Sequence, residues 1–206
     1  PQANAAPIKE TLAAALCDLA RLRPYHTLYD PMCGSGTILI EGAMMVHNIA
    51  PGVNRYFSAE RWDVIDEKIW ADERNRARDL VNYDTDFIAY GSDIDGDAIE
   101  IAKINAKRAG VERKIKFEKA DIRNFEPKSE KGTVICNPPY GERLLDIEEA
   151  QKLYKIMGEK FIRKHGWSYY VISPSEEFEK EFGRKADKRR KLYNGMIKCQ
   201  LFMYFK

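Results

Sequence analysis

Apolar and polar positions along the chain follow two periods in turn, and this order predicts alternating helices and strands. Apolar residues spaced three and four apart predict helices over residues 7–22, 37–48, 97–109, 148–164 and, more briefly, 175–182. Short apolar and β-branched runs predict strands over residues 27–29, 87–92, 115–120, 132–136 and 167–173. Strands that alternate with helices favour the α/β class with a mainly parallel sheet.

Two segments depart from this alternation. Residues 191–193 and 197–205 predict a final hairpin that turns at Asn194-Gly195. Residues 54–86 are rich in charge and predict one or two surface helices, inserted between the first two α/β units and anchored by Trp62 and Trp70. We interpret this insertion as mainly structural and expect residues 1–206 to form a single domain.

Composition narrows the class of protein. The 206 residues are 44% hydrophobic and 32% charged, which is typical of a soluble globular domain. No apolar run approaches the ~20 residues that a membrane span needs, so we expect no membrane partner. The four cysteines and three histidines are scattered and lack zinc-ligand spacing, which predicts reduced thiols, a cytoplasmic protein and no metal site.

Charge is distributed unevenly, although the net charge is only +2. Between Arg184 and Lys206 there are eight basic residues against the single acidic residue Asp187. Such a segment forms either a positive face that meets phosphate or a solvated surface loop. The sequence leaves both interpretations open.

Polar residues follow four of the predicted strands, at Asp30, Asp93, Asp121 and Asn137. Ligands of open α/β sheets bind outside the carboxyl ends of the strands. The coincidence of four polar strand ends therefore predicts a ligand site at this edge.

The first strand runs into the segment Asp30-Pro31-Met32-Cys33-Gly34-Ser35-Gly36-Thr37. Its two glycines let the backbone bend tightly and approach a ligand, and the helix that follows offers free N–H groups that suit a carboxylate. An ordinary strand-to-helix turn has the same features. A nicotinamide site is rejected, because Leu39 stands where its third glycine belongs and Asp93 lies far beyond the usual spacing.

The later strand ends suit an adenosine. Asp93 can accept hydrogen bonds from two ribose hydroxyls, and Ile94 can pack on an adenine face. Asp121 can accept from the adenine amino group, with the backbone of Ile122 nearby. Helix capping or turn chemistry is the alternative for both aspartates. The whole set predicts S-adenosylmethionine as the cofactor.

The fourth strand leads into Asn137-Pro138-Pro139-Tyr140. The Asn137 side-chain oxygen and the Pro138 carbonyl can each accept one N–H of a planar amino group and aim its lone pair for methyl transfer. Two prolines stiffen the loop, and Tyr140 can stack on the ring that bears the amino group. Carbon-5 methylation of a pyrimidine fits poorly, because Cys136 belongs to the buried strand.

These residues resemble the methyltransferase domain of the THUMP-associated RNA methylases, close to bacterial 23S rRNA guanine-N2 methyltransferases, whose relatives often carry the name N6-adenine-specific DNA methylase. The resemblance covers nearly the whole chain and rests on these segments: residues 6–15, 30–37, 40–41, 50–52, 61–62, 92–95 and 137–144.

The resemblance implies a Rossmann-like class I fold with a seven-stranded sheet and a C-terminal antiparallel hairpin, S-adenosylmethionine as donor, and RNA as partner. It also implies an amino-terminal THUMP domain that this chain does not contain. Thr11 matches a position that touches the methionine end of the cofactor. The expected cofactor-binding residues are Thr11, Asp30, Pro31, Cys33, Gly34, Ser35, Gly36, Thr37, Asp93, Ile94, Asp121, Ile122 and Asn137.

The leading functional hypothesis is methylation of guanine N2 in 23S ribosomal RNA, with Asn137, Pro138, Pro139 and Tyr140 as the catalytic loop. The alternatives are adenine N6 methylation of DNA or RNA, methylation of a protein glutamine amide, and an RNA-binding module with a vestigial pocket. A base within folded RNA would have to be extruded into the site.

Overall fold

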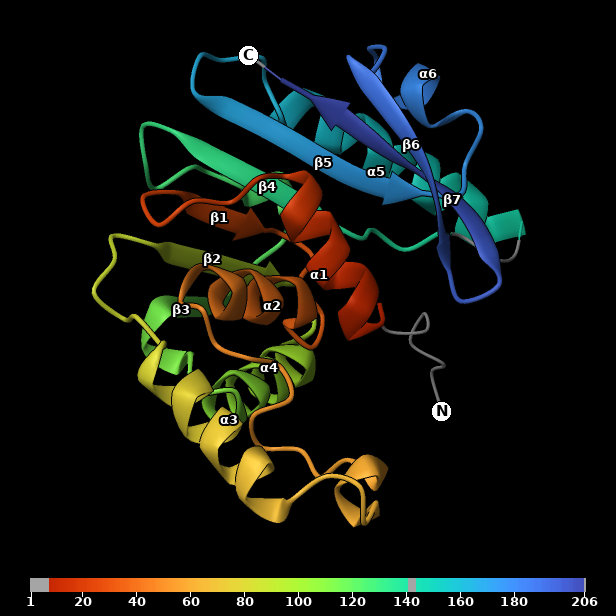
Figure 1. Ribbon diagram of the computed structural model, residues 1–206. Coiled ribbons are helices and arrows are strands. Elements are labelled where there is room, and N and C mark those ends of the chain that lie inside the picture. Colours follow the sequence, from red (N-terminus) through yellow and green to blue (C-terminus); the bar gives the residue numbers. More distant parts are fainter. Residues whose placement is uncertain (1–7, 141–143, 206) are drawn as a thin grey trace.

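The computed structural model describes residues 8–140 and 144–205. In these residues seven strands form one sheet of order β3-β2-β1-β4-β5-β7-β6 (Figure 1). The first five strands run parallel, and β7 pairs antiparallel with both β5 and β6. The strands are β1 (Thr27–Asp30), β2 (Ile88–Asp93), β3 (Ile115–Lys119), β4 (Gly132–Cys136), β5 (Trp167–Ser173), β6 (Lys188–Asn194) and β7 (Ile197–Tyr204).

Helices cover both faces of the sheet (Figure 1). One face packs against α1, α2 and α4 and the other against α5 and α6, each around its own cluster of buried apolar residues. Because both faces of β4 are covered, all five of its residues are buried. The helices are α1 (Glu10–Leu19), α2 (Thr37–Val46), α3 (Glu67–Asp79), α4 (Gly96–Arg108), α5 (Leu144–Lys160) and α6 (Phe178–Phe182), with short 3₁₀ turns η1 (Ser58–Arg61), η2 (Glu112–Lys114) and η3 (Ile122–Asn124).

The order of the strands reverses at β1. The chain moves from β1 to β2 and β3 on one side and then returns to place β4 on the other side. A crevice opens at such a switch point beyond the carboxyl ends of the strands. The polar residues that end β1, β2 and β4 are therefore brought to one edge of the sheet.

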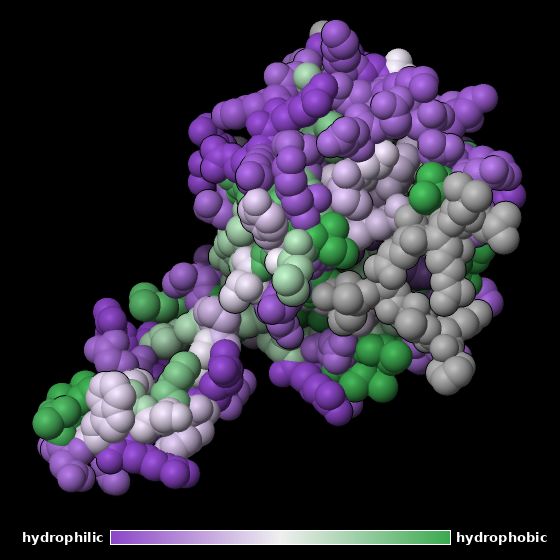
Figure 2. All heavy atoms as spheres, turned by 90° about the vertical axis from the view of Figure 1, so that its right-hand side faces the viewer, coloured by the Kyte–Doolittle hydropathy of each residue, from purple (hydrophilic) through white to green (hydrophobic). Residues whose placement is uncertain are grey.

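The insertion predicted at residues 54–86 consists of η1 and α3. It projects from the body beyond α4 (Figures 1 and 2). Trp70 stacks on Phe57, with ring centroids 6.0 Å apart, and serves as the expected anchor. The prediction for Trp62 is wrong, because its side chain is 59% exposed.

The predicted fold class is confirmed, and the errors lie at element ends. The helix expected over residues 148–164 is α5, which begins and ends four residues earlier. The basic segment that starts at Arg184, for which a surface loop was one interpretation, contains the edge strand β6. This strand begins at Lys188, three residues before the start at residue 191 that the hydrophobic pattern predicts. The expected helix start at Pro7 lies outside the described residues.

The contact between α5 and α6 depends on a glycine. A Cβ added at Gly158 would collide with the backbone carbonyl of Phe182, whereas a Cβ at Gly96, in the first turn of α4, would lie 3.5 Å from the flexible Lys119 side chain. We expect Gly158→Ala to lower the free energy of unfolding by about 1–3 kcal/mol, because α6 must shift. Gly96→Ala is the matched control and should change it by less than about 0.5 kcal/mol. Urea unfolding measures both, and equal effects would contradict this packing.

Candidate active site at the carboxyl edge of the sheet

The turn after β1 is fastened to the neighbouring strand β2. The Cys33 N–H donates to the Ser92 carbonyl at 2.9 Å, and the Gly34 N–H donates to Asp93 Oδ2 at 2.9 Å. The other oxygen of Asp93 accepts the Asp95 N–H at 2.9 Å, which starts the turn into α4. Asp93 therefore holds two backbone segments at the point where a ligand would meet the sheet.

The two glycines of this turn serve different purposes. Gly36 has a φ of 82°, and a Cβ there would lie 3.1 Å from both Ala102 and Phe117, so it permits close packing of the turn on α4 and β3. Gly34 has a φ of 50°, and a Cβ there would meet no heavy atom of the described residues within 4 Å. The open side at Gly34 is the one that a ligand can approach.

The residues after Gly34 prepare the start of α2. Ser35 Oγ and Thr37 Oγ1 lie 3.2 Å apart, and the Ser35 carbonyl accepts from Asn105 Nδ2 at 3.2 Å. The residue before α2 is Gly36, which has no side chain to cap the first N–H groups of the helix. Those N–H groups suit a carboxylate.

Asp30 ends β1 in the interior, with only 2% of its surface exposed. Its Oδ1 accepts the Met32 N–H at 3.2 Å. Burial raises the pKa of the Asp30 carboxyl to about 8, and the nearby charge of Asp93 acts in the same direction. Because Asp30 holds a proton at neutral pH, it supplies an O–H donor at this edge rather than a negative charge.

The other residues expected to bind the cofactor differ in whether their side chains are exposed. Pro31 and Cys33 are buried, so neither side chain is open to a ligand. Thr11 is exposed on the first turn of α1. Ile94 is 65% exposed directly after Asp93 and offers a flat apolar surface, whereas the Ile122 side chain is buried in the core on the α5 face.

Asp121 has turn partners of its own. Its Oδ1 accepts the backbone N–H of Arg123 at 2.8 Å and caps η3, and its Oδ2 pairs with the Arg123 guanidinium at 2.6 Å. These hydrogen bonds from Arg123 lower the pKa of the Asp121 carboxyl to about 2. A ligand amino group at Asp121 would have to share the carboxylate with Arg123.

The loop after β4 starts at the carboxyl end of that strand, which lies between β1 and β5 in the sheet. Asn137 and Tyr140 are partly buried, Pro138 is buried and Pro139 is exposed. The Tyr140 hydroxyl donates to Asn137 Oδ1 at 2.6 Å, and its ring packs against the core on the α1 face. Burial raises the pKa of the Tyr140 hydroxyl, so it remains a proton donor at neutral pH.

Two residues of the terminal hairpin also reach this loop, and sequence reasoning missed both. Asn194 Nδ2 donates to the Tyr140 hydroxyl at 3.2 Å, and Cys199 Sγ lies 3.8 Å from it. They are more than fifty positions from Tyr140 along the chain. Asn194 had been interpreted only as a turn residue, and the sequence carries no local signal that joins it to the loop.

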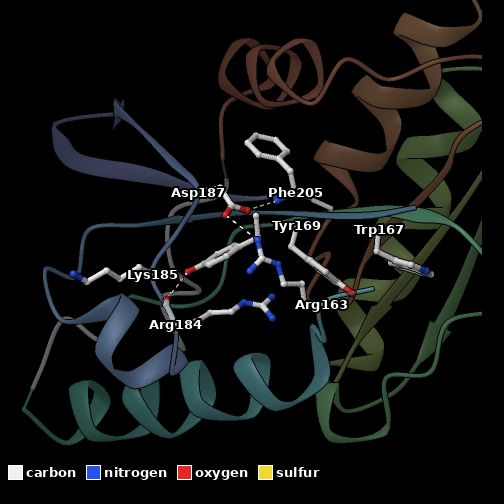
Figure 3. A pocket seen from close by; sticks show the side chains of 8 residues that line it. Arg163, Trp167, Tyr169, Arg184, Lys185, Asp187 and Phe205 are labelled. Carbon is white, nitrogen blue, oxygen red and sulfur yellow. Dashed lines mark hydrogen bonds and ion pairs between the residues drawn. The ribbon is translucent and has the colours of Figure 1, made fainter. Parts of the chain in front are cut away.

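The basic segment is only partly free to meet a ligand. Arg184 lies over the rings of Tyr169, Phe182 and Tyr204 and donates to the Phe161 carbonyl. In Figure 3 it points into a pocket of about 60 Å³, whereas Lys185 points away from it. This pocket lies where β5 begins and β7 ends, which is the sheet edge opposite Asn137.

Arg189 is also occupied, since it pairs with Glu179. Lys185, Lys188, Arg190 and Lys191 remain exposed. The positive face is therefore narrower than the count of basic residues suggests.

In residues 8–140 and 144–205, no three His, Cys, Asp or Glu side chains gather as metal ligands would. The absence of a metal site stays a prediction. Among the helices that the structure describes, none is both long and apolar enough to cross a membrane.

This strand order, with a glycine turn after β1 and an acidic residue at the end of β2, defines a class I S-adenosylmethionine-dependent methyltransferase. A family model described as "RMKL-like, methyltransferase domain" matches residues 1–202. The chain therefore belongs to the family of RMKL-like methyltransferase domains.

Similar proteins agree with this assignment. YpsC of Bacillus subtilis (strain 168), named as a candidate RNA methyltransferase, is 44% identical over 97% of this chain and 52% of its own length. Ribosomal RNA large subunit methyltransferase K/L of Shewanella sp. (strain W3-18-1) is 40% identical over 97% of this chain and 29% of its own length. The crystal structure of SMU.472, a candidate methyltransferase complexed with SAH, is 44% identical with a TM-score of 0.91, over 98% of this chain and 54% of that one.

S-adenosylmethionine is thus the cofactor of this domain, as predicted. The chain spans about half the length of YpsC and less than a third of the K/L protein.

The buried Asp30 carboxyl makes a pH-dependent contribution to stability. Its raised pKa means that the folded protein holds a proton between about pH 4 and pH 8 that the unfolded chain releases. Stability from this group therefore falls as the pH rises through that window. Between these pH values, the free energy of unfolding of Asp30→Asn should rise relative to that of the unsubstituted protein, by up to about 1.4 kcal/mol for each pH unit. Urea unfolding between pH 5 and pH 9 measures this, and a difference that does not change with pH would contradict it.

Proposed function

We propose that this chain transfers a methyl group to the exocyclic amino group of a nucleobase, namely guanine N2 in large-subunit ribosomal RNA. The observation that carries the proposal is the position of the Asn137–Tyr140 loop beside the glycine turn, across the switch point of the sheet. The names of the K/L and YpsC relatives support RNA as the substrate class.

The residues of this edge fit the cofactor. The open side of Gly34 leaves room for close approach, and the uncapped start of α2 suits the carboxylate of the methionine group. The carboxylate of Asp93 favours the positive charge of the cofactor. We propose Asp93 for the ribose, Ile94 for one face of the adenine, and Asp121 for the adenine amino group.

S-adenosylmethionine supplies an electrophilic methyl group. The protein's part is to hold the amino group of the target base in line with it. Asn137 Oδ1 has two lone pairs, and Tyr140 uses one of them, so the second can accept an N–H of the base. The Pro138 carbonyl is the proposed acceptor for the other N–H. Holding both N–H bonds turns the nitrogen lone pair toward the methyl group and requires no strong base.

The Tyr140 ring is the proposed surface on which the target base stacks. Its hydroxyl is bound to Asn137 and Asn194, so the ring is already oriented before a base arrives. This preorganisation lowers the entropy cost of placing an extruded base.

The hairpin tip is the proposed contact for RNA flanking the target base. Lys191 lies over the Tyr193 ring at 5.3 Å, and Lys198 is the cross-strand neighbour of Tyr193. All three residues are exposed. They lie next to the end of β6, from which Asn194 donates to the Tyr140 hydroxyl. An aromatic ring with two lysines suits a base and its neighbouring phosphates.

Gly34→Ala tests the cofactor site, with Gly183→Ala as its matched control. Both glycines have positive φ and open space at the Cβ position, but Gly183 ends α6, away from the site. We expect each variant to lose about 1–2 kcal/mol of stability from backbone strain. Only Gly34→Ala should weaken S-adenosylmethionine binding, by about tenfold or more, because its methyl group fills the open side. Calorimetric titration measures this, and equal dissociation constants would contradict the site.

The reaction is tested by incubating the intact protein with labelled S-adenosylmethionine and unmodified large-subunit ribosomal RNA, followed by nucleoside digestion. We expect N2-methylguanosine as the product. Asn137→Ala should lower kcat by at least about 100-fold, as loss of a positioned polar group does, and leave the cofactor dissociation constant nearly unchanged.

Recovery of N6-methyladenosine would move the target to adenine and keep the mechanism of the loop. Transfer to a protein glutamine with none to nucleic acid would overturn the nucleobase substrate. Full activity of Asn137→Ala would overturn the amino-group mechanism.

A further inference from the structure

The terminal hairpin is connected to the Asn137–Tyr140 loop by a directed chain of hydrogen bonds. Asn194 Nδ2 donates to the Tyr140 hydroxyl at 3.2 Å, and that hydroxyl donates to Asn137 Oδ1 at 2.6 Å. The chain runs from β6 to the end of β4, although β5 and β7 lie between these strands in the sheet. Its three members, Asn137, Tyr140 and Asn194, span almost sixty positions of the sequence.

The direction of this chain is fixed by the number of protons available. A phenol has a single O–H, so Tyr140 can donate to one partner at a time. An amide N–H from Asn194 occupies an acceptor position of the hydroxyl and leaves that single proton for Asn137. Hydrogen bonds arranged head to tail also polarise and strengthen one another.

The hairpin holds Asn194 firmly in place. Asn194 is the last residue of β6 and pairs with Ile197 across the turn. Gly195 takes the positive φ, 61°, that a tight two-residue hairpin turn requires at its first central position. Asn194 is 9% exposed, and Cys199 beside it is 1% exposed, so the donor is enclosed by the β6–β7 pair.

We propose that Asn194 is a positioning residue for methyl transfer, which acts through the Tyr140 hydroxyl to orient the side-chain oxygen of Asn137. This inference rests on the proposed function, in which that oxygen accepts an N–H of the target base. It assigns the antiparallel β6–β7 pair a part in catalysis besides completing the sheet.

Two substitutions of Asn194, one isosteric and one that removes the amide group, separate positioning from packing. In Asn194→Asp the new carboxylate accepts the Tyr140 proton, which turns the hydroxyl away from Asn137. In Asn194→Ala the hydroxyl loses a partner but keeps its proton for Asn137. The isosteric aspartate should therefore lower kcat by about tenfold or more, equivalent to one lost hydrogen bond, and alanine by only about two- to threefold. KM for the cofactor should stay the same in both.

Tyr140→Phe keeps the ring and removes the hydroxyl, so it should match Asn194→Asp in kcat. Tyr83→Phe is the control and should leave kcat unchanged, because it removes a hydroxyl that donates to the Gly110 carbonyl at 3.3 Å, and Tyr83 belongs to none of the proposed binding residues. If aspartate is tolerated as well as or better than alanine, Asn194 is only a turn residue and the proposal is wrong.

A second measurement needs no substrate. In protein labelled with ¹⁵N-asparagine, the side-chain NH₂ resonances of Asn137 are identified by their loss in Asn137→Asp. We expect them to shift in Asn194→Asp and in Tyr140→Phe but not in Tyr83→Phe. Unchanged Asn137 resonances in Asn194→Asp would overturn the link. A shift in a protein that methylates no ribosomal RNA would keep the link and reject the proposed substrate.

Discussion

The carboxylate of Asp93 is the interaction on which this edge of the molecule depends. One of its oxygens holds the Gly34 N–H and the other holds the Asp95 N–H, so it joins the turn after β1 to the turn after β2. A carboxylate bound by two backbone N–H groups is a rigid support. Together with the hydrogen bond from the Cys33 N–H to the Ser92 carbonyl, it fixes the open side of Gly34 and the uncapped start of α2 relative to the end of β2.

The order of the strands places this support beside the Asn137–Tyr140 loop, for which we propose the catalytic role. Because β1 is the switch point, the chain returns to set β4 next to β1, and the two motifs meet although about a hundred residues separate them. The antiparallel β6–β7 pair then extends the sheet far enough for Asn194 to reach Tyr140. Parallel strands thus supply the proposed cofactor side, and the hairpin stabilises the loop that we propose receives the target base.

The sequence predicted the parts of the fold that depend on local periodicity. Strands β4 and β5 were predicted with their observed bounds, because buried runs between turn residues are unambiguous. The prediction that Trp62 anchors the insertion is wrong, because an apolar side chain is buried only when another part of the fold packs against it. Asp121 illustrates a further limit, since its pairing with Arg123 depends on the geometry of η3 rather than on spacing. Asn194 could not be connected to Tyr140, because the contact spans two other strands and exists only in the folded sheet.

The ends of β1 and β4 meet at the switch point of the sheet, where we propose that the cofactor and the target amino group come together. A crystal structure of the protein with S-adenosylhomocysteine would show whether they do. We expect ribose hydroxyls within hydrogen-bond distance of Asp93 and the sulfur facing the side chain of Asn137. A ligand bound at this edge with its sulfur turned away from Asn137, or bound elsewhere, would contradict this proposal.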